Sequence, residues 1–380
     1  VEEYLQENKI SIKFNDITKL YDVSGMNEEN IEHLQTIFPS LIYSKLQSEY
    51  KNCSVQNITA YLYIIASRHH YNPVIDMLNQ YKYSGVDYLT QLYEIMGISE
   101  DDNLSKTLIL KWLWQCVSLL HNDFGKPFGA EGILVLTGRQ GVGKTSLFKK
   151  LAIQDDFFKE GQTINFHDKD SYIRCVSCWI AELGEIESTF KSDVAKLKAF
   201  ITNALDEYRR PYGRGDIRTP RRTSLCGTCN SDEFLIDTSG NRSFWTVHVK
   251  KIDVEALQNF NSIQLWKQIQ MLSKDNLQGF RLSTSEREQL ENRNKSHEKK
   301  LKGEDEIEDI LNMSDGSNYR IIWANMTVTE FKQLYDDILK PYSVSVIGKC
   351  LDKLGYNTII RKIEGKTQRL RNLPKRKYFY

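Results

Sequence analysis

The sequence predicts an α/β protein in which a central domain lies between a mostly helical N-terminal region and a small C-terminal domain. Strand and helix patterns alternate from residue 131 to about 250, as in a three-layer α/β domain. Residues 285–306 are almost wholly polar and predict a charged linker. After them, the order helix, helix and β-hairpin is typical of a winged helix. We therefore expect domains at residues 1–103, 104–284 and 307–380, with a linker at 285–306.

The overall composition excludes a membrane protein and points to a polyanion as partner. With 40% hydrophobic and 27% charged residues the chain is ordinarily globular. Its longest apolar runs are far shorter than the roughly 20 residues that a membrane span needs, and no signal peptide is visible, so we expect a cytoplasmic protein. Lys plus Arg (51) and Asp plus Glu (50) balance, but residues 341–380 carry ten basic and two acidic side chains. This basic end is a candidate nucleic-acid binder.

Two CxxC pairs among the seven cysteines raise the question of a zinc site. Cys175 and Cys178 lie in the run CVSCWIAEL, and Cys226 and Cys229 lie in TSLCGTCN. We interpret both runs as β-strands, in which positions i and i+3 face opposite sides. We therefore expect buried thiols rather than zinc ligands.

The strongest chemical motif is GRQGVGKT, from Gly138 to Thr145, which fits the phosphate-binding pattern G-x-x-x-x-G-K-[ST]. The apolar strand ILVLT precedes it and the helix SLFKKLA follows it; the alternative is a glycine-rich structural turn. Backbone N–H groups of such a loop cradle phosphates, the lysine reaches the β and γ phosphates, and the threonine binds Mg²⁺. We expect ATP and Mg²⁺ as ligands, with nucleotide contacts from Gly138, Gly141, Val142, Gly143, Lys144, Thr145 and Ser146.

Polar residues follow two further strands of the same domain. The run CWIAELGEIE ends in Glu182 and Glu185, where a nucleotidase carries its Mg²⁺ ligand and its water activator. The run TSLCGTCN ends in Asn230, whose amide can hold the attacking water. The alternatives are solvated acids at a strand end and an ordinary turn asparagine.

Arg242, twelve residues after Asn230, lies on an expected exposed turn. An arginine there is badly placed for the nucleotide of its own subunit but could reach that of a neighbour. This position predicts an arginine that acts between subunits.

The runs KDSYIRCVSCWIAELGEIE, LKAFITNALDEYRRPYGR and GTCNSDEFLIDTSGNRSFW resemble the virulence-associated protein E-like P-loop family of phages and mobile elements. The resemblance implies an AAA+-type ATPase similar to superfamily 3 and MCM-like helicases, working as a six-subunit ring with shared ATP sites. Lys144 and Thr145 then match Walker A, Glu182 and Glu185 Walker B, Asn230 sensor 1, and Arg242 the arginine finger. The family usually has Arg where Ser243 stands, so the finger rests on Arg242 alone. It also usually has Thr where Cys229 stands.

The basic run EYRRPYGRGDIRTPRR (residues 207–222) falls where such helicases insert a β-hairpin. Its tip would carry Arg214 and Arg218 toward DNA, and the arginines near its base, at 209, 210, 221 and 222, would face ATP phosphates; a solvated charge run is the alternative. In the C-terminal hairpin Arg361, Lys362, Arg369 and Arg371 would make a basic wing. The sequence thus predicts an ATP-dependent replicative helicase or initiator that binds single- and double-stranded DNA, including an origin, with a primase as a candidate partner. The rival is an ATP-dependent DNA-binding switch that does not unwind.

Overall fold

The computed structural model describes residues 1–26, 34–47, 54–166, 168–184, 194–209, 216–230, 235, 241–297, 301–363 and 366–378. The chain divides into two compact units, Val1–His297 and Glu298–Tyr380. The division falls inside the stretch 285–306 that we expect as a linker, although its first part forms helix α13 (Thr284–Lys295) in unit 1. Within the described ranges, no helix combines the length and the apolar character needed to cross a membrane.

Unit 1 begins with a small mixed α/β layer. Strands β1 (Ser11–Asn15), β2 (Tyr21–Ser24) and β3 (His70–Tyr71) form a sheet in the order β2-β1-β3. Strand β1 pairs antiparallel with β2 and parallel with β3. Helices α1 (Glu2–Glu7), α2 (Leu34–Leu46) and α3 (Val55–Ala66) supply Leu5, Phe38 and Leu62 to a core shared with Phe14. The run KISIKFND thus contains the single strand β1, and the run ITAYLYIIASRH contains most of helix α3.

Three helices then lead into the main sheet. They are α4 (Pro73–Asn79), α5 (Tyr88–Ile95) and α6 (Asn103–Leu120). Each begins at a polar residue whose side chain accepts hydrogen bonds from the first turn, namely Asn72, Asp87 and Asp102. Pro73 occupies the first turn of α4, where its missing N–H costs nothing. The long apolar helix α6 is buried on most sides.

The centre of unit 1 is a five-stranded parallel sheet in the order β10-β4-β9-β6-β5. Its strands are β4 (Ile133–Thr137), β5 (Phe158–Gln162), β6 (Ile180–Leu183), β9 (Ser224–Cys229) and β10 (Phe244–His248). Every residue of β4 is buried. Leu134 and Leu136 join the core on one face, whereas Ile133 and Val135 join the core on the other. A continuous apolar run is therefore required, because helices cover both faces.

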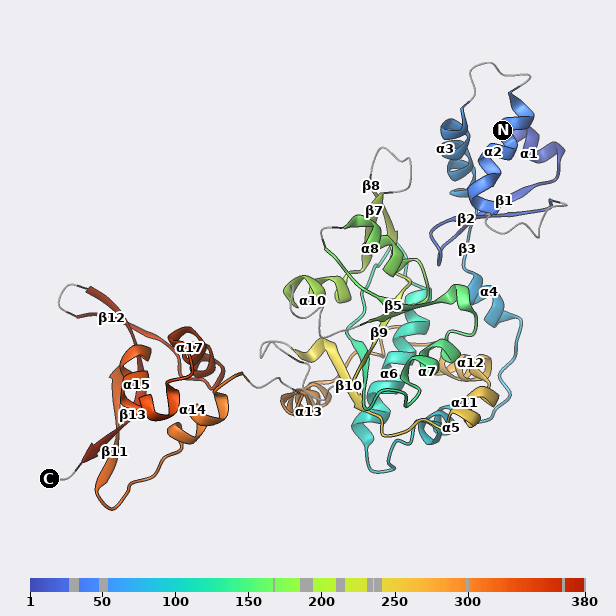
Figure 1. Cartoon of the computed structure of the whole chain (residues 1–380). Coiled ribbons are helices and arrows are strands. Elements are labelled where there is room, and N and C mark those ends of the chain that lie inside the picture. Colours follow the sequence, from blue (N-terminus) through green and yellow to red (C-terminus); the bar gives the residue numbers. More distant parts are fainter. Residues whose placement is uncertain are drawn as a thin grey trace. The chain divides into compact units, whose positions relative to one another are not determined.

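The two faces carry different helices (Figure 1). Helix α6, α7 (Lys144–Leu151) and α12 (Ser262–Ser273) pack on the first face, through residues such as Trp112, Phe148 and Trp266. Helices α8 (Lys169–Val176) and α10 (Val194–Thr202) pack on the second, through Val176 and Phe200. Helix α11 (Val254–Asn259) and the short turns η1 (Asp155–Phe157) and η2 (Asn241–Ser243) complete the unit.

One predicted strand is wrong at its beginning. The run CVSCWIAEL does not start as a strand, because Cys175 lies in the last turn of α8 and β6 begins only at Ile180. The apolar residues of KDSYIRCV follow a helical period after the cap at Asp168, and this period outweighs the local strand preference. The second run agrees with the prediction, since Cys226 and Cys229 lie in β9. The described cysteines at 116, 175, 178, 226, 229 and 350 are free and buried.

A separate two-stranded hairpin rises from the end of α10. It consists of β7 (Leu205–Arg209) and β8 (Asp216–Pro220), paired antiparallel from Leu205 with Pro220 to Arg209 with Asp216. The predicted hairpin in residues 207–222 is thus present, and its tip, 210–215, lies outside the described residues.

Unit 2 has its own core and its own antiparallel sheet. Its elements are α14 (Glu304–Leu311), β11 (Tyr319–Met326), α15 (Val328–Leu334), α16 (Asp336–Leu339), α17 (Val344–Lys353), β12 (Ile359–Ile363) and β13 (Lys366–Tyr378). Strand β13 lies between β11 and β12. The run TVTEFKQLYDDIL forms two helices, α15 and α16, which are divided at Tyr335. There the backbone leaves the helical region (φ −123°, ψ 38°) and the buried phenol donates a hydrogen bond to the Pro374 carbonyl at 3.2 Å.

Candidate functional site

The loop between β4 and α7 has the backbone that the glycine pattern demands. Gly138 has a φ of +140°, and a Cβ atom there would lie 2.2 Å from the Val249 carbonyl oxygen. Gly143, at a φ of +96°, begins α7 in the left-handed region. The Ile252 N–H donates to the Val142 carbonyl at 3.2 Å and ties the loop to the chain that follows β10. The loop is therefore held open at the carboxyl end of β4, with the first turn of α7 behind it.

Lys144 is buried and its ammonium faces only neutral hydrogen-bond acceptors. It donates to the carbonyl oxygens of Gly138 (2.6 Å) and Arg139 (2.9 Å) and to Oδ1 of Asn230 (3.1 Å). Among the described residues no carboxylate forms an ion pair with it. Burial lowers its pKa, and the Cys229 thiol and Glu182 partly oppose this shift. A cation in this position is stabilised by a bound anion.

Thr145, Glu182 and Thr228 form a compact group of oxygen atoms beside Lys144. The hydroxyls of Thr145 and Thr228 each donate to Oε1 of Glu182, both at 2.8 Å. Glu182 is only 2% exposed, and burial raises the pKa of its carboxyl group. Hydroxyl and carboxylate oxygens are the ligands that Mg²⁺ prefers. The donor set therefore fits a magnesium ion held by Thr145 and Glu182.

Strand order explains why these side chains meet. Strand β9 lies between β4 and β6, with Thr137 opposite Cys229 and Glu182 opposite Cys226. Residues at the carboxyl ends of parallel strands share one edge of the sheet. The structure thus brings together Lys144, Thr145, Glu182 and Asn230, which lie far apart in sequence. Glu185, the second predicted acid, lies outside the described residues.

Arg242 lies at the opposite edge of the same sheet. It belongs to η2, directly before β10, and β10 pairs in parallel with β4 from Phe244 opposite Ile133. Arg242 is therefore at the amino ends of the strands, and five strand residues of about 3.3 Å each separate it from its own phosphate-binding loop. Its exposed side chain lines a cleft of about 810 Å³ together with Lys198, Arg281 and Arg287. The arginine therefore does not reach the β4–α7 loop of its own chain.

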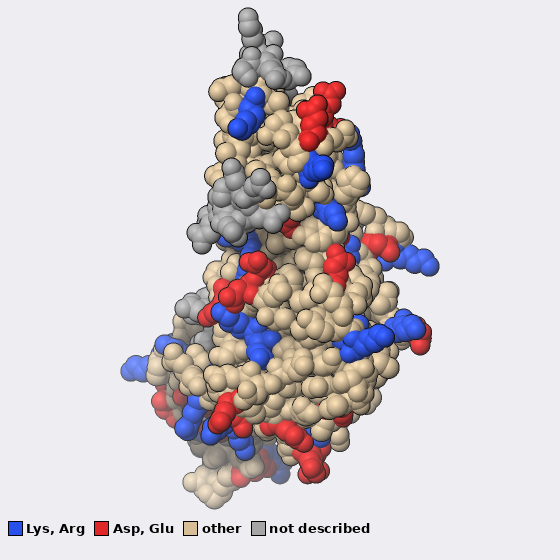
Figure 2. Space-filling view, turned by 90° about the vertical axis from the view of Figure 1, so that its right-hand side faces the viewer, with Lys and Arg blue, Asp and Glu red and all other residues tan. Residues whose placement is uncertain are grey.

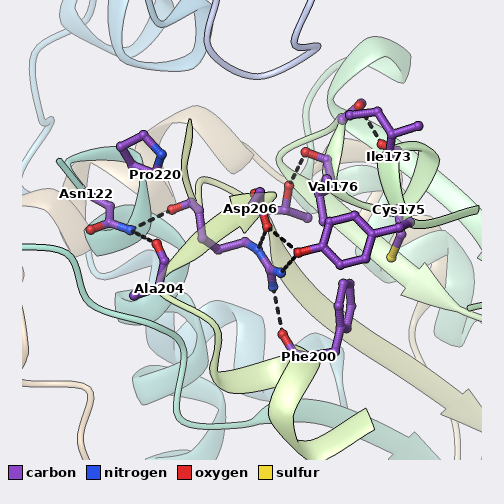
Figure 3. A network of polar contacts seen from close by, with 12 residues as sticks. Asn122, Ile173, Cys175, Val176, Phe200, Ala204, Asp206 and Pro220 are labelled. Carbon is purple, nitrogen blue, oxygen red and sulfur yellow. Dashed lines mark hydrogen bonds and ion pairs between the residues drawn. The ribbon is translucent and has the colours of Figure 1, made fainter. Parts of the chain in front are cut away.

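A buried polar network anchors the base of the β7–β8 hairpin (Figure 3). The Arg221 guanidinium forms an ion pair with Asp206, and both side chains are fully buried. Arg221 also donates to the Phe200 carbonyl (3.1 Å) and lies 4.6 Å above the Phe200 ring. From the end of α6, the Asn122 amide donates to the carbonyls of Ala204 (3.0 Å) and Arg221 (3.1 Å), so both ends of the hairpin are held.

The prediction that the hairpin-base arginines face ATP phosphates is wrong for Arg221, because its side chain is fully buried. Its guanidinium forms a buried ion pair with Asp206. Arg222 donates to the Leu120 carbonyl and forms a 3.2 Å ion pair with Asp16, which belongs to the N-terminal layer. Of the predicted tip residues, Arg218 is exposed and pairs with Glu207 at 3.0 Å, and Arg214 lies outside the described residues.

Three of the four basic residues predicted for the C-terminal hairpin are exposed on it, and the fourth is not. Arg361, Lys362 and Arg369 are exposed on β12 and β13. Arg371 is 6% exposed and forms an ion pair with Asp352 at 2.6 Å, so its guanidinium is turned into unit 2. Successive residues of a strand point to opposite faces. Asn372, the next residue of β13, is exposed, so Arg371 points toward the core of unit 2. By contrast, the face of unit 1 in Figure 2 mixes basic and acidic side chains and carries no continuous stripe of one sign.

Sequence reasoning missed three residues. Thr228 lies two positions before Asn230, so strand alternation could have placed both on one side. Asn122 and Lys19 carry no local signal, because their partners, the hairpin base and Pro220, are distant in sequence.

Comparisons with known proteins agree with this architecture. No curated protein matches the chain. The solved structure titled the apo structure of the NrS-1 C-terminal region is similar at a TM-score of 0.50 and 13% identity, covering 98% of each chain, which indicates a shared fold. A second structure, the A form of the same apo region, gives a TM-score of 0.49 and 14% identity, again over 98% of both chains. The family model for the virulence-associated protein E-like domain matches residues 78–299, more than half of the sequence, and the chain therefore belongs to this family.

Proposed function

We propose that this protein is an ATP-dependent replicative DNA helicase or replication initiator of a phage or mobile genetic element. The observation that carries the proposal is the meeting of Lys144, the Thr145–Glu182 pair and Asn230 at the carboxyl edge of a parallel sheet. A lysine that pairs with no carboxylate of the described residues, a ligand pair for a divalent cation and a neutral amide are parts that phosphoryl transfer needs.

The site residues have distinct roles in this proposal. Lys144 binds the β and γ phosphates of ATP, and the backbone N–H groups from Gly141 to Ser146 cradle them. Thr145 and Glu182 hold Mg²⁺, which would neutralise part of the phosphate charge when the ion is bound. Asn230 orients the attacking water, and we assign the activation of that water to Glu185. Thr228 positions Glu182 through its hydrogen bond to the carboxylate.

Two features support an AAA+-type motor that works as a ring. The strand bearing Asn230 lies between the strands bearing the phosphate loop and Glu182, an order typical of such motors. Arg242 and the phosphate loop occupy opposite edges of the sheet. A head-to-tail contact would bring the arginine of one subunit to the nucleotide of the next, and such contacts close into rings. We propose a hexamer with shared ATP sites.

Unit 2 supports DNA binding. Its order of helices followed by the β12–β13 hairpin is that of a winged helix, and Arg361, Lys362 and Arg369 make the hairpin basic. We propose that unit 2 binds duplex DNA at an origin and that the β7–β8 hairpin with Arg218 contacts the strand being moved.

The test is strand separation coupled to ATP hydrolysis. Wild-type protein should hydrolyse ATP faster with single-stranded DNA and should unwind a forked duplex. Lys144→Ala should abolish both activities, whereas Lys149→Ala should keep them, because Lys149 is an exposed lysine on the same helix that pairs with Asp155.

Arg242→Ala should lower turnover on the order of a thousandfold, and mixing it with Lys144→Ala should restore some activity. DNA-stimulated hydrolysis without unwinding would instead identify a DNA-binding switch.

A further inference from the structure

A second cleft in unit 1 lies where the N-terminal layer meets the β7–β8 hairpin. It has a volume of about 450 Å³. One wall comes from the N-terminal layer, with Asp16, Lys19 and His70. A second wall comes from the loop after α6, with Asp123 and Phe124. The third wall comes from β8 and the residues after it: Ile217, Arg218, Thr219, Pro220 and Arg222. No role proposed above uses Lys19 or Phe124.

Lys19 is a buried cation that forms no direct ion pair with any carboxylate of the described residues, although Asp16 and Asp206 lie near enough to act on it electrostatically. It is 3% exposed, and among the described residues its ammonium group makes one hydrogen bond, to the Pro220 carbonyl at 3.4 Å. Within the same described ranges it makes no ion pair. An ammonium group has three donors, and burying it without compensation is costly. Because it lines the cleft, a ligand in the cleft could supply the missing negative charge.

The acidic groups of the cleft are already engaged. Asp16 accepts from Arg222 at 3.2 Å and contacts His70 Nδ1 at 2.7 Å. Asp123 accepts two backbone N–H groups of its own turn, from Gly125 (2.7 Å) and Lys126 (3.0 Å). Among the residues that the structure describes, Arg218 pairs with Glu207 alone, and exposed pairs of this kind are weak. The cleft therefore favours an anion.

Phe124 adds an apolar surface that is held in place. Its ring is 63% exposed, although the residues on either side are fixed by the Asn122 amide and the Asp123 turn. Ile217 and Pro220 are further apolar parts of the wall. An exposed aromatic ring beside cationic groups is the arrangement that binds a nucleotide unit, because the base stacks and the phosphate pairs.

We propose that this cleft binds one nucleotide unit of a single DNA strand, with the phosphate at Lys19 and the base against Phe124. The inference rests on the proposed function for the choice of strand as ligand, and it places part of the strand's path at the base of the hairpin. It also gives the N-terminal layer a role, since that layer contributes the phosphate ligand.

The test uses the full chain without ATP, so its outcome does not depend on hydrolysis or unwinding. Binding of a labelled oligothymidylate is measured by fluorescence anisotropy at several salt concentrations. Lys19→Met should flatten the slope of log affinity against log salt by about 0.7, the value for one lost phosphate contact. Lys126→Met, an exposed lysine of the same loop outside the cleft, should leave the slope unchanged. Melting curves confirm that each variant is folded.

Phe124→Ala should lower affinity roughly tenfold at every salt concentration with an unchanged slope, because a stacking contact releases no counter-ion. Phe124→Trp should retain binding. If Lys19→Met keeps the wild-type salt slope and Phe124→Ala keeps the wild-type affinity for the oligonucleotide, the proposal is overturned.

Calorimetry with thymidine monophosphate and with inorganic phosphate tests the source of the anion. If either compound binds wild type but not Lys19→Met while oligonucleotide binding is unaffected, the cleft takes a free phosphate compound and the assignment to a strand is wrong.

Discussion

Glu182 shows how one residue can be unfavourable for the free protein and necessary for its proposed chemistry. Burial raises the pKa of its carboxyl group, so the ionised form costs folding free energy at pH 7.5. This cost appears as the pH rises through the window between the ordinary and the raised pKa, and it is fully present above that window. Under the proposed function, a bound divalent cation would offset this cost.

Glu182→Gln should thus raise the melting temperature in magnesium-free buffer at pH 7.5 and abolish ATP hydrolysis. Both threonine hydroxyls donate to the same oxygen, Oε1, so the glutamine carbonyl can accept both bonds. Calorimetric melting as a function of pH measures the effect, and the gain should shrink as the pH falls and wild-type Glu182 becomes protonated. Glu160→Gln, at an exposed acid of β5, is the control and should change stability by no more than about 0.5 kcal/mol. A lower melting temperature for Glu182→Gln would contradict this account.

Lys19 gives a second prediction with the opposite direction of pKa shift. Burial lowers its pKa from 10.5 to about 8, despite the opposing charges of Asp206 and Asp16. The folded protein therefore releases this proton more easily than the unfolded chain, and stability should rise between pH 8 and pH 10.5. At pH 7, Lys19→Met should increase the free energy of unfolding by up to about 3 kcal/mol, since one pKa unit corresponds to about 1.4 kcal/mol. Urea unfolding at pH 7 and pH 10 measures this; an equal gain at both values would exclude the charge as its cause.

At the scale of elements, the β7–β8 hairpin carries one buried ion pair and one exposed ion pair, which should contribute very different amounts to stability. Asp206→Ala leaves the Arg221 guanidinium buried without its partner, which should cost about 3–5 kcal/mol. Glu207→Ala, on the next residue of β7, removes only the exposed pair with Arg218 and should cost less than about 1 kcal/mol. Denaturant unfolding of the two variants gives the comparison. Asp206→Leu combined with Arg221→Met should recover much of the loss, and similar costs for both single changes would argue against a burial effect.

The elements also show what a sequence can and cannot predict. The β4 strand, the phosphate loop and α7 are local: an apolar run, glycines with positive φ and a helical pattern determine each of them. The acid at 182 and the amide at 230 follow from the rule that polar residues gather at the carboxyl ends of parallel strands. The helical state of Cys175 and the break at Tyr335 depend on caps and on a partner strand, so local apolar patterns gave the wrong element.

Residues that join distant segments escaped prediction for a different reason. Lys19 and Pro220 are 201 positions apart, and nothing near either residue indicates the other. Arg221 and Arg218 look alike in a basic run, yet one is fully buried and the other is exposed. Arg218 belongs to β8, whereas Arg221 follows the end of that strand and is buried through its contacts with Asp206 and Phe200, which no local pattern indicates.

At the scale of the whole molecule, the division into two units predicts where the chain can be cut. Unit 2 includes α14, whose Ile307, Ile310 and Leu311 lie in the same core as Phe331 and Ile347. A cut after His297 leaves each core complete, whereas a cut after Asn312 removes most of unit 2 and leaves the apolar face of α14 uncovered. Exposed apolar faces of this kind promote self-association.

We therefore expect the fragment 1–297 to be monodisperse and to keep the magnesium and nucleotide site, whereas 1–312 should self-associate. The fragment 298–380 should melt cooperatively, because its hydrophobic core is made entirely of its own residues, and under the proposed function it should bind duplex DNA. Size-exclusion chromatography, circular dichroism and anisotropy with labelled duplex measure these properties. In the folded fragment, Arg361→Ala should weaken duplex binding, whereas Arg371→Ala should mainly lower stability, because Arg371 is paired with Asp352. An unfolded 298–380 fragment would show that unit 2 depends on unit 1, and equal loss of DNA affinity without loss of stability in both variants would place Arg371 back on the binding surface.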